Sequence, residues 1–370
     1  MKRNEIIKIY GTDHKEMTKK LLKASGLSSI IEAKGLSKDA LIGIKPNLVT
    51  CSPAEYGGTT HTGIIAGIIE YLRSSGYDNL LIIEGSWVGD RTSEAFLYCG
   101  YEDLSEKYGV SLFDTQKDTS FKADCAGLTL SVCSKVKDID FLINVPVLKG
   151  HCQTKMTCAL KNMKGLIPNS EKRHFHQMGL HKPIAHLNTY IRQDFIVVDN
   201  ICGDPYFEEG GSPLVKNCIF TSLDPVLTDA YACRELGISK EEVPYVMMSE
   251  RLKIGSTEEP SVRVIGESRD EEEGREQRKL LDVSYAVDDS DTCSACYACL
   301  TGALLRLQEE GILENLHVKI GIGQGMRGKT GPLGVGSCTK DFLVNIPGCP
   351  PTEEEIYLGL KEYIEKGVTK

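Results

Sequence analysis

Five cysteines near the C-terminus are spaced in a way that could hold a metal centre. Cys293, Cys296 and Cys299 are spaced C-x2-C-x2-C in CSACYACL, and Cys338 and Cys349 follow in GVGSCTK and IPGCPP. Thiolates three positions apart can point at one centre where the chain turns into a helix. The proline after Cys349 removes a backbone donor and fixes the chain, which leaves neighbouring amides free to face sulfide. The sequence therefore predicts a cysteine-ligated iron–sulfur cluster.

Five cysteines compete for the four ligand positions of a [4Fe–4S] cluster. One set is Cys293, Cys296, Cys299 and Cys349, with ferredoxin-like spacing, and the other replaces Cys299 by Cys338. We favour the second set, because Cys299 lies within an apolar helical pattern and Cys338 in a glycine-flanked turn. Structural zinc and a group of unrelated thiols are the alternatives, since ligand number alone does not identify the metal. The glycine-rich surroundings favour the cluster, because sulfide needs close backbone amides.

A second group of reactive side chains lies between residues 149 and 186. Five of the eight histidines are here, with seven basic residues: His151, His174, His176, His181, His186, Lys149, Lys155, Lys161, Lys164, Lys172, Arg173 and Lys182. A basic, histidine-rich loop in an acidic protein predicts a site for a small anionic substrate. We assign catalytic roles to Lys149, His151 and Lys161, because lysines can hold a carboxylate or phosphate and histidine can move a proton.

Three further residues are expected to bind the same substrate. Lys45 and Asn47 follow an apolar strand, with Pro46 stiffening the turn, and Asn162 follows Lys161. An asparagine side chain presents both a donor and an acceptor. A purely structural turn is the alternative. The remaining histidines of the segment, His174, His176, His181 and His186, are interpreted as solvated, the first two on a surface loop.

The first 266 residues predict an α/β domain with a doubly wound, mostly parallel sheet. Apolar runs that end in an acid or glycine, such as LLIIEG and FIVVDN, are typical of strands buried on both faces. Their alternation with helical patterns indicates the doubly wound class, in which ligands gather beyond the carboxyl ends of strands. The expected strands are Ile6–Tyr10, Leu41–Lys45, Leu80–Glu84, Phe141–Val145, Phe195–Val198 and Cys218–Ser222, and the expected helices include Thr62–Ser75, Ala185–Arg192 and Pro225–Leu236.

The C-terminal part predicts a smaller α/β unit that carries the cysteines. Residues 267–279 are charged throughout and are interpreted as a linker. Residues 280–370 then contain helical patterns at 296–309 and 353–365 and strand patterns at 317–322 and 342–346, with a glycine-rich stretch between the strands.

Composition and charge argue against several classes of function. A net charge of −9 argues against a generic nucleic-acid binder, and no run approaches the roughly 18 apolar residues of a membrane span. The first residues lack the apolar segment of a secretory signal, so the fourteen cysteines indicate metal or redox chemistry in the cytoplasm. Isolated cysteines in apolar stretches are expected to be small buried residues: Cys125, Cys133, Cys202, Cys218 and Cys233.

Several motifs in order resemble the domain-of-unknown-function family 362 (DUF362). They are IKPNLV, LIIEGS, VPVLKGH, ALKNMKGLIP, IVVDNI, SLDPVLTDAYACRELGI and the three cysteine motifs. The resemblance implies an α/β core and an iron–sulfur cluster, and it implies no reaction. Many relatives carry an eight-cysteine ferredoxin module, which is absent from this sequence, so a two-cluster electron wire is not expected.

The leading hypothesis is a [4Fe–4S] oxidoreductase or electron-transfer protein that acts on a small anionic substrate with a redox partner protein. One alternative is a hydro-lyase in which three cysteines leave one iron open as a Lewis acid. The other is a non-enzymatic binding or redox-sensing protein. No motif reveals a flavin or other second cofactor, or the oligomeric state.

Overall fold

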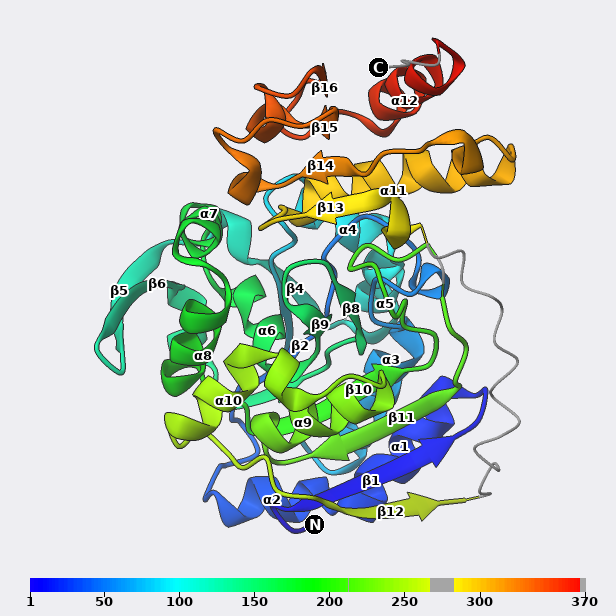
Figure 1. Ribbon diagram of the computed structural model, residues 1–370. Coiled ribbons are helices and arrows are strands. Elements are labelled where there is room, and N and C mark those ends of the chain that lie inside the picture. Colours follow the sequence, from blue (N-terminus) through cyan, green and yellow to red (C-terminus); the bar gives the residue numbers. More distant parts are fainter. Residues whose placement is uncertain (212, 267–282, 367–370) are drawn as a thin grey trace. The chain divides into compact units, whose positions relative to one another are not determined.

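The computed structural model describes residues 1–370 except 212, 267–282 and 367–370 (Figure 1). The chain divides into two compact units, Met1–Arg275 (unit 1) and Glu276–Lys370 (unit 2). The predicted linker, 267–279, lies outside the described residues.

Unit 1 is built on a mixed, mostly parallel sheet of eight strands in the order β12-β1-β11-β10-β7-β2-β3-β4. Only the pairs that β11 makes with β1 and with β10 are antiparallel. The predicted fold class is thereby confirmed. The strands are β1 (Glu5–Tyr10), β2 (Ile42–Lys45), β3 (Leu80–Glu84), β4 (Ser111–Asp114), β7 (Phe141–Asn144), β10 (Phe195–Asn200), β11 (Cys218–Ser222) and β12 (Ser261–Ile265).

The central strands form because their apolar runs are covered on both faces. Every residue of β2, β3, β7 and β10 is buried. Alternate side chains enter two separate apolar clusters, so that Phe141 and Ile143 pack on one face while Leu142 packs on the other. One face is covered by α1 (His14–Ser25), α2 (Leu27–Ala33), α3 (Thr62–Ser74), α4 (Thr92–Tyr98) and α5 (Tyr101–Tyr108). The other is covered by α6 (Ala159–Asn162), α7 (Asn169–Met178), α8 (His181–Tyr190), α9 (Pro225–Glu235) and α10 (Pro244–Arg251).

The start of α9 follows the sequence prediction closely. Asp224 accepts hydrogen bonds from the backbone amides of Val226 and Leu227 at 2.9 and 3.0 Å. Pro225 occupies the first turn, where its missing donor costs nothing.

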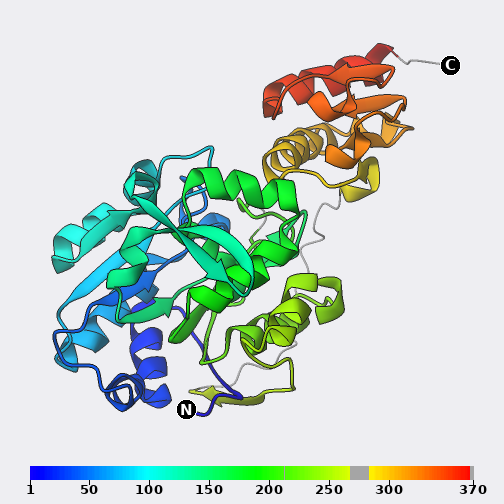
Figure 2. The ribbon, with the colours of Figure 1, turned by 90° about the vertical axis from the view of Figure 1, so that its left-hand side faces the viewer.

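Two hairpins lie outside the main sheet. One pairs β5 (Ser120–Cys125) with β6 (Leu128–Cys133), and it lies at the left of Figure 1 and toward the viewer in Figure 2. The other pairs β8 (Lys149–His151) with β9 (Lys155–Thr157). The segment 149–186 is therefore not a loop, as the sequence suggested, but this hairpin followed by α6, a short 3-10 helix (Met163–Leu166), α7 and α8.

Unit 2 contains a parallel sheet in the order β13-β14-β15-β16 with two helices. Its elements are β13 (Val287–Asp289), α11 (Ser294–Glu309), β14 (Ile320–Ile322), β15 (Leu333–Val335), β16 (Val344–Ile346) and α12 (Glu353–Lys366). Leucines and isoleucines of both helices and the strands form its core. Of the helices in the described part of the chain, none is long and apolar enough to cross a membrane.

The glycine-rich stretch of unit 2 contains a strand, β15, that the sequence did not predict. Its glycines make room for an aromatic ring, since a Cβ on Gly321 or Gly331 would lie 2.4 or 2.5 Å from the ring of Phe342. Packing against Phe342 therefore accounts for these two glycines.

Candidate functional site

The four favoured cysteines of unit 2 all follow the carboxyl ends of its parallel strands. Cys293 caps α11 after β13, and Cys296 lies in the first turn of that helix. Cys338 lies in a 3-10 turn (Ser337–Thr339) after β15, and Cys349 follows β16. The last two loops are joined by a hydrogen bond of 2.7 Å from the amide of Ser337 to the carbonyl of Gly348. Sequence-distant thiols are thereby brought to one edge of the sheet.

The electrostatics of these thiols show that they are close to one another. Burial, together with the thiolates of Cys293, Cys349, Cys338 and Cys299, raises the pKa of Cys296 to about 12. Burial also raises the pKa of Cys293, where Cys338 and Cys349 add to the effect. Like charges gathered in a partly buried place are costly unless a cation neutralises them.

Polar neighbours surround the thiols without neutralising them all. The Nε2 of Gln324 lies 3.2 Å from the Sγ of Cys293, and Arg327 hydrogen-bonds to Cys338. A Cβ on Gly336 would lie 3.9 Å from the Sγ of Cys296. Within the described residues, no three His, Cys, Asp or Glu side chains are placed to hold a single metal ion. A [4Fe–4S] cluster takes one thiolate on each of four irons, and the loops that carry these cysteines lie at one end of the parallel strands.

Cys299 lies one turn further along α11 than Cys296. It packs against the apolar core of unit 2 beside Leu300 and Leu304. Its thiolate is also among the neighbouring charges that raise the pKa of Cys296.

In unit 1, Lys45 is held in a buried ion pair. Its Nζ lies 2.7 Å from both carboxylate oxygens of Glu84 and 2.7 Å from the carbonyl of Pro46. Glu84 also accepts from the amides of Leu48 and Gly85 at 2.9 and 2.7 Å. Both side chains are almost completely buried, so the ammonium of Lys45 is engaged within the protein.

Asn47, Asn162 and Lys149 form one hydrogen-bonded chain beside this pair. Asn47 donates to the Oδ1 of Asn162 at 3.0 Å, and Asn162 donates to the Oδ1 of Asn144 at 2.7 Å. The ammonium of Lys149 donates to the Oδ1 of Asn47 at 3.1 Å and to the carbonyls of Gly58 and Glu208. Burial lowers the pKa of Lys149 to about 8. These residues tie the ends of β2, β7 and the segment after β10 together.

Glu208 joins the two remaining predicted catalytic residues. Its carboxylate pairs with Lys161 and accepts from the Nε2 of His151 at 3.0 Å. Although burial disfavours the charge, His151 and Lys161 hold the pKa of Glu208 well below its usual range. Burial lowers the pKa of His151 to about 4, so its ring is neutral. Its Nδ1 accepts from the amides of Gln153 and Thr154 at 3.0 and 3.1 Å, which leaves the proton on Nε2.

Two basic groups beside Glu208 are less fully engaged. The Nζ of Lys164 has no hydrogen-bond or ion-pair partner among the described residues, and burial together with Lys161 lowers its pKa to about 7. The Nδ1 of His176 is buried without a partner in the same part of the chain. Burial, Lys164 and Lys161 lower the pKa of His176 to about 3. These groups leave positive potential and an unused ring nitrogen next to the Glu208 carboxylate.

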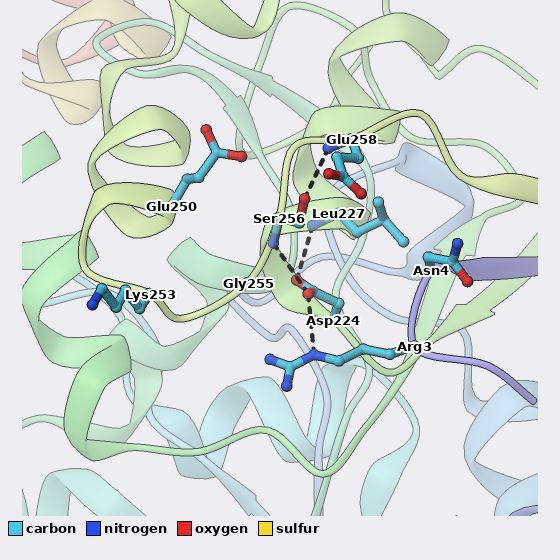
Figure 3. Close-up of a pocket in the computed structure, with 9 residues that line it drawn as sticks. All are labelled: Arg3, Asn4, Asp224, Leu227, Glu250, Lys253, Gly255, Ser256 and Glu258. Carbon is cyan, nitrogen blue, oxygen red and sulfur yellow. Dashed lines mark hydrogen bonds and ion pairs between the residues drawn. The ribbon is translucent and has the colours of Figure 1, made fainter.

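A surface pocket of about 410 Å³ lies at the opposite edge of the same sheet (Figure 3). It is lined by Arg3, Asn4, Asp224, Leu227, Glu250, Lys253, Gly255, Ser256 and Glu258. Asp224 caps α9 here and also meets the Nε of Arg3 at 3.3 Å. Because β11 is antiparallel to β10, Ser222 pairs with Ile196 at the start of β10, so this pocket is far from the ends that carry Lys45 and Asn47.

A family model described as a domain of unknown function, DUF362, matches residues 42–234. The chain belongs to the DUF362 family. The matched segment runs from β2 to α9 and includes Lys45, Lys149, His151, Lys161 and Glu208, whereas the cysteines of unit 2 lie beyond it. No curated protein matches the sequence.

The fold of this DUF362 protein has a distant likeness to a solved structure, the lactate racemase apoprotein from Thermoanaerobacterium thermosaccharolyticum. The two sequences are 12% identical, the match covers 62% of this chain and 56% of the racemase chain, and the TM-score is 0.40. A likeness at this level assigns no function.

Sequence reasoning missed the acidic partners of this DUF362 site. Glu208 lies in an irregular segment between β10 and β11, and no sequence pattern around it predicts that its carboxylate points inward. His174 and His176 were expected on a surface loop, but they lie on α7, which forms because Phe175 and its neighbours bury one face. His174 is exposed and pairs with Glu171, whereas the Nδ1 of His186 donates to the carbonyl of Cys125 and His181 stacks on Tyr245.

Proposed function

We propose that this DUF362 protein is an iron–sulfur protein whose unit 2 binds a [4Fe–4S] cluster through Cys293, Cys296, Cys338 and Cys349. The proposal rests on one observation: these thiols, from three segments of sequence, lie at one edge of a parallel sheet and perturb one another electrostatically. Cys299 then serves as a packing residue of α11. When bound, the cluster supplies one-electron transfer.

The proposed activity is oxidoreduction or electron transfer, with a small anionic substrate bound in unit 1 and a redox partner protein as electron source or acceptor. Lys161 and Lys164 hold the anion, in the place that the Glu208 carboxylate takes in this structure. His151 presents a proton on Nε2 to the same place. Lys45, Lys149, Asn47 and Asn162 position these groups, because their own polar atoms are engaged with one another and with Glu84.

A reducing compartment suits this proposal. In this structure none of the fourteen cysteines is in a disulfide, and five of them lie outside both the cluster set and the five isolated buried positions: Cys51, Cys99, Cys152, Cys158 and Cys299. Free thiols in such number persist in a cytoplasm-like redox environment.

The test of the cluster is anaerobic purification with iron and acid-labile sulfide assays and an electron paramagnetic resonance spectrum of the reduced protein. About four irons and four sulfides per chain are expected for a cubane. Cys338→Ser and Cys349→Ser should each lose the cluster, and Cys299→Ser, from the same helix as Cys296, is the matched control that should keep it.

Three outcomes would contradict the proposal in different ways. Tightly bound zinc without sulfide would replace it by a structural metal site. Loss of the cluster in Cys299→Ser with retention in Cys338→Ser would restore the ferredoxin-like ligand set. A cluster that assembles when one of Cys338 and Cys349 is replaced would favour the hydro-lyase, in which one iron stays open.

A further inference from the structure

One thiol of unit 1 makes a contact that differs from those of the other buried cysteines. The Sγ of Cys202 lies 3.6 Å from the Nε2 of His61, and the Nδ1 of His61 lies 2.8 Å from the Oδ2 of Asp199. Asp199 lies in β10, Cys202 follows that strand, and His61 caps α3. The order thiol, imidazole, carboxylate is the arrangement that activates a nucleophile.

Asp199 fixes the imidazole in one orientation. Its carboxylate also accepts from the backbone amide of His61 at 2.9 Å and from that of Ile201 at 3.1 Å. Burial would raise the pKa of Asp199, but His61 and these bonds hold it below its usual range. Burial would lower the pKa of His61, but Asp199 and the contact with Cys202 raise it to about 10. A protonated imidazole therefore faces the sulfur at neutral pH.

A second histidine and two backbone carbonyls lie beside Cys202 and His61. His14 of α1 stacks edge-on against His61 with ring centroids 5.0 Å apart. The carbonyls of Ala54 and Glu55 lie 3.4 and 3.8 Å from the Sγ of Cys202. Asp199 carries the compensating charge, so one anion and one cation are already present before the thiol ionises.

Two neighbouring thiols provide an internal contrast. Cys51 and Cys99 are more exposed than Cys202, and burial together with nearby charges raises the pKa of each to about 11. Their sulfur atoms lie near backbone carbonyls, that of Arg91 at 3.9 Å from Cys51 and that of Ser52 at 3.2 Å from Cys99. Exposure alone would make them the more reactive pair, whereas the imidazole favours Cys202.

We propose that Cys202, His61 and Asp199 form a thiol site that reacts with small hydroperoxides. Cys202 is 5% exposed and His61 7% exposed, which restricts the reactant to a small molecule. The thiolate attacks one peroxide oxygen, so that an S–O bond forms and the O–O bond breaks. Sulfur is oxidised by two electrons to sulfenic acid, the peroxide is reduced, and its leaving oxygen takes the proton of His61 to give water or an alcohol.

The first measurement is anaerobic alkylation of the full-length protein with iodoacetamide, followed site by site by mass spectrometry. At pH 7 we expect Cys202 to react about tenfold faster than Cys51 and Cys99, because the imidazole of His61 contacts its sulfur. Equal or slower reaction of Cys202 would overturn the proposal, since exposure would then decide.

The second measurement uses hydrogen peroxide with a chelator and a sulfenic-acid trap in the same protein. Trapped sulfenic acid should appear first at Cys202. Fast alkylation without a trapped product would show an ionised thiol that does not react with peroxide, and would also overturn the proposal.

Two variants separate activation from folding. His61→Asn and Asp199→Asn should slow the reaction of Cys202 while the rates of Cys51 and Cys99 stay unchanged. Unchanged reaction of Cys202 in both variants would refute the role of the imidazole. If a substitution disturbs the fold, the buried Cys158 becomes reactive in that variant. The ratio of the Cys202 rate to the Cys51 and Cys99 rates in the wild-type protein then decides.

Discussion

The two units handle buried charge in opposite ways. In unit 1 nearly every buried ammonium has a carboxylate or carbonyl against it, as Lys45 has Glu84 and Lys149 has three oxygen partners. In unit 2 four groups of one kind face one another, with Gln324 and Arg327 as polar neighbours. A network that is internally paired needs no ligand to be stable, whereas thiols whose pKa is raised become thiolates only where a cation stabilises them. The comparison separates residues that hold the fold from residues that await a partner.

Removal of metal should have the largest effect and should affect only unit 2. A reducing chelator is expected to abolish the cooperative unfolding transition of unit 2, because a ligand bound to the folded state alone stabilises it. The transition of unit 1 should stay in place. Differential scanning calorimetry before and after chelation measures both, and equal shifts of both transitions would contradict the comparison.

Breaking the buried pair of unit 1 should cost stability without any ligand. Glu84→Gln is expected to lower the free energy of unfolding by about 3–5 kcal/mol, because the ammonium of Lys45 is left buried without its anion. Urea denaturation of the purified protein measures the change. Glu32→Gln is the control, because the Lys38–Glu32 pair is exposed and should contribute less than about 1 kcal/mol. Adding Lys45→Met should recover part of the loss.

Packing in unit 2 offers a test that leaves the thiols in place. Gly321→Ala is expected to lower the free energy of unfolding by about 1–3 kcal/mol, since its Cβ would overlap the Phe342 ring. Phe342→Leu in the same protein should relieve part of that cost. Iron and sulfide content should be unchanged, and its loss would mean that Gly321 acts at the cluster and not only in the core.

The pH dependence of Lys164 gives the smallest and most specific effect. With its pKa lowered to about 7, this lysine is charged below pH 7 and neutral above it, so binding of small carboxylates should weaken as pH rises past 7. An unfolded lysine keeps its proton to about pH 10.4, so the free energy of unfolding should rise by about 1 kcal/mol between pH 7 and pH 8. Lys164→Met should remove both trends, which titration calorimetry and urea denaturation can follow, and Lys155→Met, on exposed chain, should keep them.

Local patterns were enough to predict the helices of unit 2 and every strand of the main sheet of unit 1 except β4 and β12. Runs such as LLIIE and FIVVDN need burial on both faces, and this requirement fixes their place in the centre of the sheet. The strand β15 was missed because glycine disfavours strands by itself and is used here to admit Phe342. Contacts between residues far apart in the sequence could not be predicted, because no local pattern indicates that Lys161 pairs with Glu208 or that His61 contacts Cys202.

The backbone around Glu208 has a kinetic consequence for unit 1. Lys149 binds the carbonyl of Glu208, and the chain nearby passes so close to Gly58 and Gly150 that a Cβ on either would meet backbone at 2.4 and 2.3 Å. With the main chain anchored, only the Glu208 side chain has to rotate for an incoming anion to take its place. Exchange with the proposed anion then requires the pairs of Glu208 with Lys161 and His151 to break but no opening of the main chain, so it should be slower than the nanosecond rotation of an exposed side chain.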